Sequence, residues 1–132
     1  MSQTDRRMDV EYDFTIKCTE GNLNEAKMLV AKNPDLDVSH DDDVAFRQAC
    51  RYGKLKVAQW LLYTFPTVNI HARYDYAFRY ACENGHLDLA QWLVEIAVNR
   101  PVNVHQDSED AFRSACKRGH IDVVKWLHKT FP

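Results

Sequence analysis

Apolar residues recur at helical spacing in the stretch 75–93, and a glycine divides them into two runs. The first run contains Ala77, Phe78 and Ala81, whose i, i+3, i+4 spacing places side chains on one face of a helix. Gly85 ends that run, and a second apolar helical run follows it. The pattern predicts a short helix, a glycine turn and a longer helix, which together form an αα-hairpin.

The same hairpin pattern occurs four times along the chain. Each copy carries a Phe, a Cys, a Gly and a Trp in the same order, with Met28 in the place of the first Trp. The recurring residues are Phe14, Phe46, Phe78 and Phe112; Cys18, Cys50, Cys82 and Cys116; Gly21, Gly53, Gly85 and Gly119; Trp60, Trp92 and Trp126. The copies are 32, 32 and 34 residues apart, and a fixed period of this length marks a solenoid. The sequence therefore predicts an all-α fold of four stacked helix-turn-helix repeats.

This repeat resembles the ankyrin repeat. Ala-Phe-Arg-x-Ala-Cys stands where that family has Pro-Leu-His-x-Ala-Ala, and Gly-His-Leu-Asp-Leu-Ala-x-Trp-Leu stands where it has Gly-His-x-x-x-Val-x-x-Leu-Leu. The resemblance covers residues 11–132 and implies an ankyrin-type solenoid. The Ala-Phe-Arg-x-Ala-Cys variant is most similar to the ankyrin arrays of giant DNA viruses that infect amoebae.

The chain departs from the family pattern at the start of the short helices. The substitutions are Val44, Tyr76 and Asp110 for the usual Thr, and Arg47, Arg79 and Arg113 for the usual His. An acidic residue precedes each arginine by four positions, and such a pair adds about 0.2–0.5 kcal/mol to a helix. We therefore expect Asp43 to cap its helix and to pair with Arg47, with Asp75 and Glu109 doing the same in later repeats. We interpret these arginines as structural rather than ligand-binding.

The length of 132 residues fits one domain. We expect a loose polar tail at residues 1–10 and an array at residues 11–132, divided into repeats at about 11–40, 41–72, 73–106 and 107–132. In the first repeat we expect helices at 14–19 and 23–32. The prolines, which cannot donate the hydrogen bond of a continuing helix, each follow a predicted long helix: Pro34, Pro66, Pro101 and Pro132. Two extra residues in the third repeat are expected in a surface loop at 99–101.

Charge and hydropathy exclude several partners. The net charge is −2 without a basic run, so the chain lacks the electrostatic footprint of a nucleic-acid or membrane-surface protein. The first residues contain no apolar signal-peptide segment. The longest uncharged run, 59–72, contains a proline and is too short to span a bilayer. We expect a cytoplasmic protein, located in the host cytoplasm if it is viral.

The four cysteines occupy one position in each repeat. Stacked helix axes lie about 8–10 Å apart, whereas a disulfide needs Cα atoms within about 7 Å. Four zinc ligands would have to converge on one ion. We therefore expect four reduced, buried, structural thiols, because free cysteine is among the most buried residue types.

The ankyrin resemblance implies a binding surface made of inter-repeat finger tips and the exposed face of the short helices. By position, the fingers are 41–43, 73–75 and 107–109, and the helix face includes Gln48 and Ser114. The residues expected to contact a partner are Asp41, Asp42, Arg51, Tyr52, Arg73, Tyr74, Tyr80, Glu83, Asn84, Lys117 and Arg118. Tyrosine and arginine are enriched in binding hot spots. Alternatively, the tyrosines only cover helix surface, and Tyr76 is partly core.

No motif for catalysis, a cofactor or a metal is found in the sequence. It has no glycine-rich phosphate loop, HExxH or nucleophile elbow. His40, His71 and His105 each precede a finger, but stacking is expected to hold them apart. The run Asp41-Asp42-Asp43 lacks the spaced acidic residues and later glutamate of a calcium loop.

Two functions remain open. The first is a non-enzymatic protein-binding module or adaptor that grips a protein partner with the concave face. The second is a structural segment of a longer array. Trp126 and Leu127, followed by Phe131, are expected where another repeat would stack, so this face is exposed, covered by further chain, or used for self-association.

Overall fold

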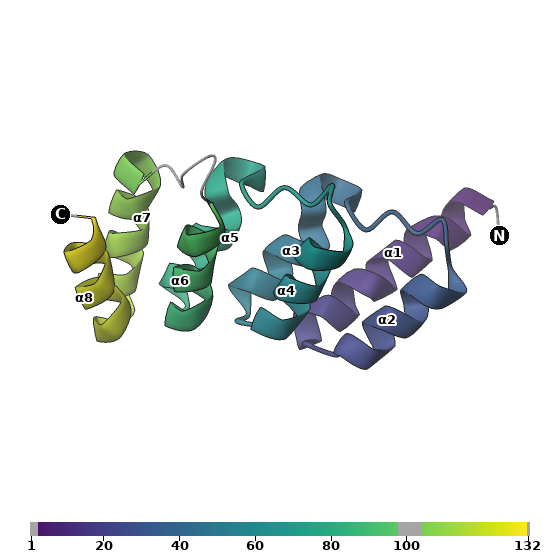
Figure 1. Cartoon of the computed structure of the whole chain (residues 1–132), viewed down its shortest axis with the longest axis horizontal. Coiled ribbons are helices and arrows are strands. Elements are labelled where there is room, and N and C mark those ends of the chain that lie inside the picture. The colour runs from purple at the N-terminus through teal and green to yellow at the C-terminus, as the bar shows by residue number, and fades with distance from the viewer. Residues whose placement is uncertain (1–2, 98–103, 132) are drawn as a thin grey trace.

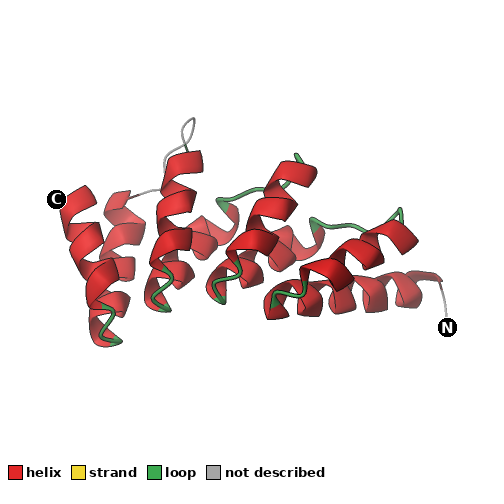
Figure 2. Ribbon diagram, turned by 60° about the horizontal axis from the view of Figure 1, so that its bottom comes forward, coloured by secondary structure: helices red, strands yellow, loops and turns green. Residues whose placement is uncertain are grey.

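The computed structural model describes the backbone of residues 3–97 and 104–131, and the side chains of residues 9–97 and 109–131. These residues form eight helices joined by loops, without a strand among them (Figure 2). The helices are α1 (Gln3–Glu20), α2 (Leu23–Lys32), α3 (His40–Arg51), α4 (Leu55–Thr64), α5 (Ala72–Glu83), α6 (Leu87–Ile96), α7 (Val104–Lys117) and α8 (Ile121–Thr130). The all-α prediction is therefore confirmed.

The helices are arranged as four pairs in two layers. The first helices of the pairs, α1, α3, α5 and α7, stack on one another in chain order, and each second helix packs on the first helix of its own pair. The pairs follow one another along the long axis, with the N- and C-terminal ends of the chain at opposite ends of the molecule (Figure 1). Each pair can bury its apolar face only against its neighbours, as in other solenoids.

The helix boundaries match the repeat pattern except at the N-terminus. Helix α2 spans Leu23–Lys32, as expected, and Pro34 and Pro66 follow α2 and α4. Helix α1 begins at Gln3, however, so the expected loose tail at 1–10 is wrong from Gln3 onward. The segment contains neither glycine nor proline, and nothing in it interrupts a helix. The inserted loop at 99–101, with Pro101, and Pro132 lie outside the described residues.

Helices α3 and α5 each begin with a left-handed turn. Residues 41–43 and 73–75 have φ between 52° and 58° although none of them is glycine. Left-handed helical backbone costs L-residues roughly 1–2 kcal/mol each. The finger tips at 41–43 and 73–75 are therefore strained turns that need side-chain support.

Arg47 and Arg79 supply that support. Arg47 donates from Nε to the Asp42 carbonyl oxygen and from Nη2 to the Asp41 carbonyl oxygen, both at 2.9 Å. Arg79 makes the equivalent bonds to the Tyr74 and Arg73 carbonyl oxygens, at 2.9 and 3.2 Å. The structural role predicted for these arginines is correct, but the predicted partner of Arg47, the Asp43 carboxylate, is wrong. The fork of the guanidinium fits two successive carbonyl groups better than one side chain.

Asp43 also differs from the prediction that it caps α3. It is buried, and its Oδ2 accepts a hydrogen bond from the backbone amide of Asn69 in the next loop, at 3.0 Å. Its Oδ1 has no hydrogen-bond partner in the described structure. Asp75 occupies the same place one repeat later, and there His71 contacts the carboxylate through Nδ1. Asp43 thus links successive repeats instead of capping its own helix.

Aromatic residues form the junctions between repeats. Phe14, Phe46 and Phe78 are each about 1% exposed and contact a tryptophan of the following repeat. The ring-centroid distances are 6.2 Å for Phe14–Trp60, 6.4 Å for Phe46–Trp92 and 6.3 Å for Phe78–Trp126. The tryptophans therefore point toward the preceding repeat. The prediction that Trp126 and Leu127 form the open C-terminal face is wrong, because Trp126 packs on Phe78 and Leu127 is buried.

The burial of each cysteine depends on whether a following repeat packs against it. All four are free thiols, and Cys18, Cys50 and Cys82 are buried as predicted. Burial raises the pKa of Cys18 to about 12 and also raises the pKa values of Cys50 and Cys82. Cys116 is exposed, which corrects the prediction of four buried thiols. The reason is local: no described helix pair packs over Cys116.

Candidate functional site

The predicted partner-binding residues form two groups on the fingers and on the layer of first helices. The first group, the finger triad, consists of Asp41, Asp42 and Arg73. Arg73 Nε lies 2.7 Å from Asp42 Oδ2, and Arg73 Nη2 lies 3.3 Å from Asp41 Oδ1. The triad joins the tips of two successive fingers. Tyr74 lies beside Arg73 in the chain and is 84% exposed, so its ring is available to a partner.

The second group, the tyrosine–arginine cluster, comprises Arg51, Tyr52, Tyr76 and Tyr80. Arg51 donates from Nη1 to the Tyr76 hydroxyl oxygen at 2.8 Å. The Arg51 guanidinium also lies 4.7 Å from the Tyr80 ring centroid and 5.7 Å from that of Tyr52. The positive charge above the rings is attracted to their negative faces. Arg51 therefore fixes tyrosines of two repeats around one guanidinium.

Arginines that hold the fingers also flank this cluster. The Arg47 guanidinium lies 5.0 Å from the Tyr76 ring centroid, and that of Arg79 lies 5.7 Å from the Tyr80 ring centroid. The Tyr76 and Tyr80 ring centroids are 4.2 Å apart. The finger turns and the tyrosine–arginine cluster are thereby connected through Arg47 and Arg79.

Sequence reasoning left Tyr76 out of the predicted partner contacts. Tyr76 is partly buried at the centre of the cluster, and Gln48 Nε2 also lies 3.4 Å from its hydroxyl oxygen. Tyr76 is thus partly buried by the side chains of this cluster, and the alternative that it belongs partly to the apolar core is not borne out. The available signal was the replacement of the family threonine by tyrosine in the repeat that follows Arg47 and Arg51.

The remaining predicted residues extend the surface toward α7. Arg118 Nη2 lies 3.4 Å from Glu83 Oε1, and Arg118 Nη1 donates to Asn84 Oδ1 at 3.1 Å. Asn84 in turn donates from Nδ2 to the Arg51 carbonyl oxygen at 3.0 Å. Lys117 is exposed beside Arg118. The side chains of the third finger, Asp107 and Ser108, lie outside the described residues.

A shallow pocket lies between α5 and α7 on this surface. It has a volume of about 290 Å³ and is lined by Arg79, Tyr80, Glu83, Asp110, Arg113 and Ser114. Predominantly polar and charged side chains therefore surround a recess next to the tyrosine–arginine cluster. Such a recess suits one polar side chain of a partner better than a buried apolar ligand.

His40 lies close to two acidic residues, Glu11 and Asp37, which the sequence did not indicate. Ligand atoms of Glu11, Asp37 and His40 lie within 4.8 Å of one another. His40 Nδ1 is 3.1 Å from Glu11 Oε2, and this contact links α1 to the start of α3. Asp37 and His40 are exposed, and the hydrogen-bonded pair accounts for the arrangement. His71 is engaged with Asp75, and the side chain of His105 lies outside the described residues.

None of the described helices has the length and apolar character of a membrane span.

Comparison with known families agrees with this architecture. A family model described as "Ankyrin repeats (many copies)" matches residues 46–94 and 78–128, windows that begin one repeat apart at Phe46 and Phe78. A search among curated proteins gives no match. The family match spans more than half of the chain, with the helix pairs and repeat register described above, so the chain belongs to the ankyrin repeat family.

Proposed function

We propose that this chain is a non-enzymatic adaptor that binds a protein partner through the finger triad and the tyrosine–arginine cluster. Ankyrin repeats are generally protein–protein interaction modules. The observation that supports this surface is the placement of Arg51 among Tyr52, Tyr76 and Tyr80. The cluster lies on the layer of first helices, next to the fingers, which is the concave face that the family resemblance implies.

The cluster has the properties of a binding hot spot. Tyrosine and arginine dominate hot spots because they combine contact area with hydrogen bonding. Arg51 is already held by Tyr76, so its side chain loses little conformational freedom when a partner binds. Tyr52 remains 48% exposed. The surface thus offers pre-arranged rings and guanidinium groups to an incoming chain.

The side-chain chemistry indicates the kind of segment that fits. Guanidinium groups above tyrosine rings can donate hydrogen bonds while the ring edges contact apolar groups. An extended segment with carboxylate or carbonyl oxygens next to an apolar side chain satisfies both. The polar recess beside Arg79 and Arg113 would take a second polar side chain of the same segment.

A double substitution tests this proposal. The wild-type chain is used to capture and identify a partner, and affinity is then measured by calorimetry for wild type and for Tyr52→Ala with Tyr80→Ala. We expect affinity to fall at least about ten-fold, which corresponds to 1.4 kcal/mol. Tyr12→Ala is the matched control, because Tyr12 is an exposed tyrosine on α1, outside the tyrosine–arginine cluster. Unchanged affinity of a folded double variant would place the interface elsewhere.

The source of the partner follows from predictions that rest on the sequence alone. The similarity to arrays of giant amoebal viruses is a prediction from the Ala-Phe-Arg-x-Ala-Cys variant. The cytoplasmic location is a prediction from the lack of a signal-peptide segment and of a membrane-spanning run, and it becomes the host cytoplasm if the chain is viral. They make an amoebal lysate the first source for capture. Capture from that lysate by wild type but not by the double variant would support the surface and the source together.

The alternative function is a structural segment that associates through its C-terminal face. The observation that favours it is Phe112, which is 38% exposed although its counterparts in the other repeats are buried. Arg113 borders both the polar recess and the C-terminal groove. Phe112 lies only in the groove and Tyr52 only in the tyrosine–arginine cluster, so substitutions at these two residues test the two functions separately.

A further inference from the structure

The two ends of the array differ in chemistry. Three junction positions are buried and apolar in the later repeats but charged in the first repeat. These positions are Asp13 where the others have Ala45, Ala77 and Ala111; Lys17 where they have Ala49, Ala81 and Ala115; Glu25 where they have Val57, Leu89 and Val123. Lys17 Nζ and Glu25 Oε2 form an ion pair at 3.0 Å on this outer face. The N-terminal face is therefore a polar cap, which solenoids need for solubility.

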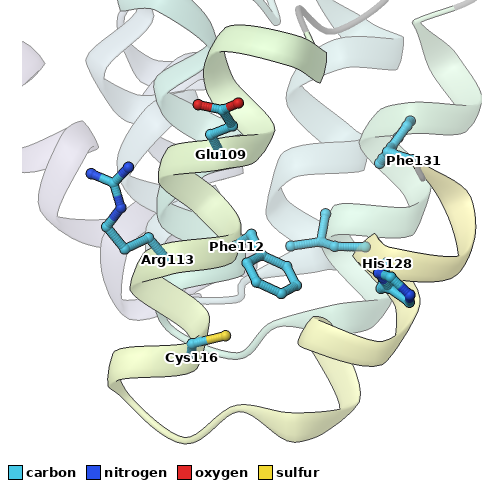
Figure 3. Close-up of a pocket in the computed structure, with 7 residues that line it drawn as sticks. Glu109, Phe112, Arg113, Cys116, His128 and Phe131 are labelled. Carbon is cyan, nitrogen blue, oxygen red and sulfur yellow. The ribbon is translucent and has the colours of Figure 1, made fainter.

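The C-terminal face keeps the apolar junction residues, and none of the described residues covers them. Phe112 and Cys116 are exposed, while the equivalent residues of the first three repeats are buried. Both line a groove of about 540 Å³ between α7 and α8, together with Leu127 and Phe131. Figure 3 shows the Phe112 ring and the Cys116 sulfur on the groove side of α7. Phe112 and Cys116 are thus residue types that are buried between repeats elsewhere in the array, but here they are exposed to solvent.

We propose that a second copy of the chain covers this groove, giving a two-fold dimer in which the two C-terminal faces meet. The opposite arrangement, with the N-terminal face of one copy on the C-terminal face of the next, would press Asp13, Lys17 and Glu25 against Phe112. The Lys17–Glu25 pair would lose its contact with water there, and the desolvation cost of a buried ion pair can exceed the attraction between its charges. A contact between identical faces avoids this and closes after two copies.

Charge on α7 favours the same arrangement. Glu109 and Arg113 border the groove, four residues apart, and are both exposed (Figure 3). Where two α7 helices run antiparallel across a two-fold axis, Glu109 of each copy lies opposite Arg113 of the other. One surface then carries two equivalent ion pairs, with the Phe112 rings between them. This self-complementarity is a requirement of an interface between identical faces.

Sedimentation velocity and light scattering of the full chain over a range of concentrations test the dimer. We expect the mass to rise with concentration and to level off at twice that of the monomer. Phe112→Glu should weaken association at least about ten-fold, with helical circular dichroism retained. Met28→Glu is the matched control, since Met28 is exposed on the capped end of the array and should leave the dimer intact.

A charge exchange distinguishes the two-fold contact from other modes. Glu109→Arg or Arg113→Glu alone should weaken the dimer, because each places like charges opposite one another. The two changes together should restore association by reversing both pairs. A monomer at all concentrations, growth beyond two copies, or failure of the double variant to recover would each overturn the proposal. None of these outcomes alters the proposed use of the tyrosine–arginine cluster.

Discussion

Arg47 and Arg79 show how one substitution supports an unusual backbone. The family histidine at this position is replaced by a side chain whose fork reaches two carbonyl groups of a left-handed turn. Arg47 is 6% exposed, whereas Arg79 is more open to solvent. The same bonds therefore lie in environments of different polarity, and water can replace the guanidinium more readily at Arg79.

Arg47→Ala is expected to lower the free energy of unfolding by about 1.5–3 kcal/mol, the range for hydrogen bonds that involve a charged group. Arg79→Ala, the matched variant in the next repeat, should lose less because of its exposure. Urea unfolding followed by circular dichroism measures both. Equal losses would mean that burial does not set the contribution of this contact.

The exposed thiol gives a second prediction at the residue scale. At dilutions where the chain is monomeric and no second copy covers the groove, Cys116 should react with a thiol reagent at neutral pH within seconds to minutes. Cys18, Cys50 and Cys82 should react only as the protein opens. The buried thiols combine inaccessibility with raised pKa values, and the thiolate is the reactive form. Cys116→Ser should abolish the fast phase. Fast reaction of more than one thiol in the native protein would contradict this assignment.

Asp43 provides a third prediction. The repeat that carries His71 satisfies the Asp75 carboxylate, whereas Ser39 takes the place of that histidine in the preceding repeat and leaves Asp43 Oδ1 without a partner. Ser39 and His71 have nearly the same backbone angles, with φ of −94° and −97°. Ser39→His should therefore stabilise the fold by about 0.5–1.5 kcal/mol. A chemical denaturation curve measures the gain, and Ser39→Gln is the control for size.

At the scale of elements, the glycine turn of one helix pair can pack against a side chain of the next pair. Gly53 and Gly119 both have positive φ, at 74° and 76°. A Cβ atom on Gly53 would lie 2.5 Å from His86 Nδ1 of the next repeat, while one on Gly119 would meet nothing within 4 Å. The imidazole of His86 thus fills the space that the missing side chain leaves, and its burial lowers its pKa.

Gly53→Ala and Gly119→Ala separate backbone strain from this contact. Gly119→Ala should cost about 1–2 kcal/mol, the expense of left-handed backbone for a residue with Cβ. Gly53→Ala should cost more, because His86 must also move. Thermal unfolding of the two variants gives the difference. If both lose the same stability, His86 does not depend on the absence of a side chain at Gly53.

The helices and their pairing could be predicted from the repeat, but their direction of stacking could not. Periodicity places Trp60, Trp92 and Trp126 on a buried face without saying whether that face meets the preceding or the following repeat. The left-handed turns at 41–43 and 73–75 were also missed, since no glycine marks them. The choice of partner-binding residues remains a prediction, because no partner is present to test it. The central place of Tyr76 was missed, although its departure from the family threonine was a visible signal.

At the scale of the whole molecule, the charged cap sets how copies can associate. Replacing its charges by junction residues, in Asp13→Ala, Lys17→Ala and Glu25→Val, removes the obstacle to stacking on the C-terminal groove. This triple variant should form open head-to-tail polymers, because a contact between different faces does not close. Light scattering should show growth beyond two copies. Adding Phe112→Glu should stop that growth, and failure to do so would separate polymerisation from the groove.

The difference between the two ends also suits synthesis on the ribosome. Domains and repeats form from the N-terminus as the chain emerges, so the α1–α2 pair forms before the later pairs. Its outer face is already compatible with water through Lys17 and Glu25. Each later pair brings a tryptophan to the phenylalanine of the pair before it. Until the next repeat forms, the growing array therefore exposes one apolar groove at its C-terminal end. The next repeat then covers that groove and exposes its own.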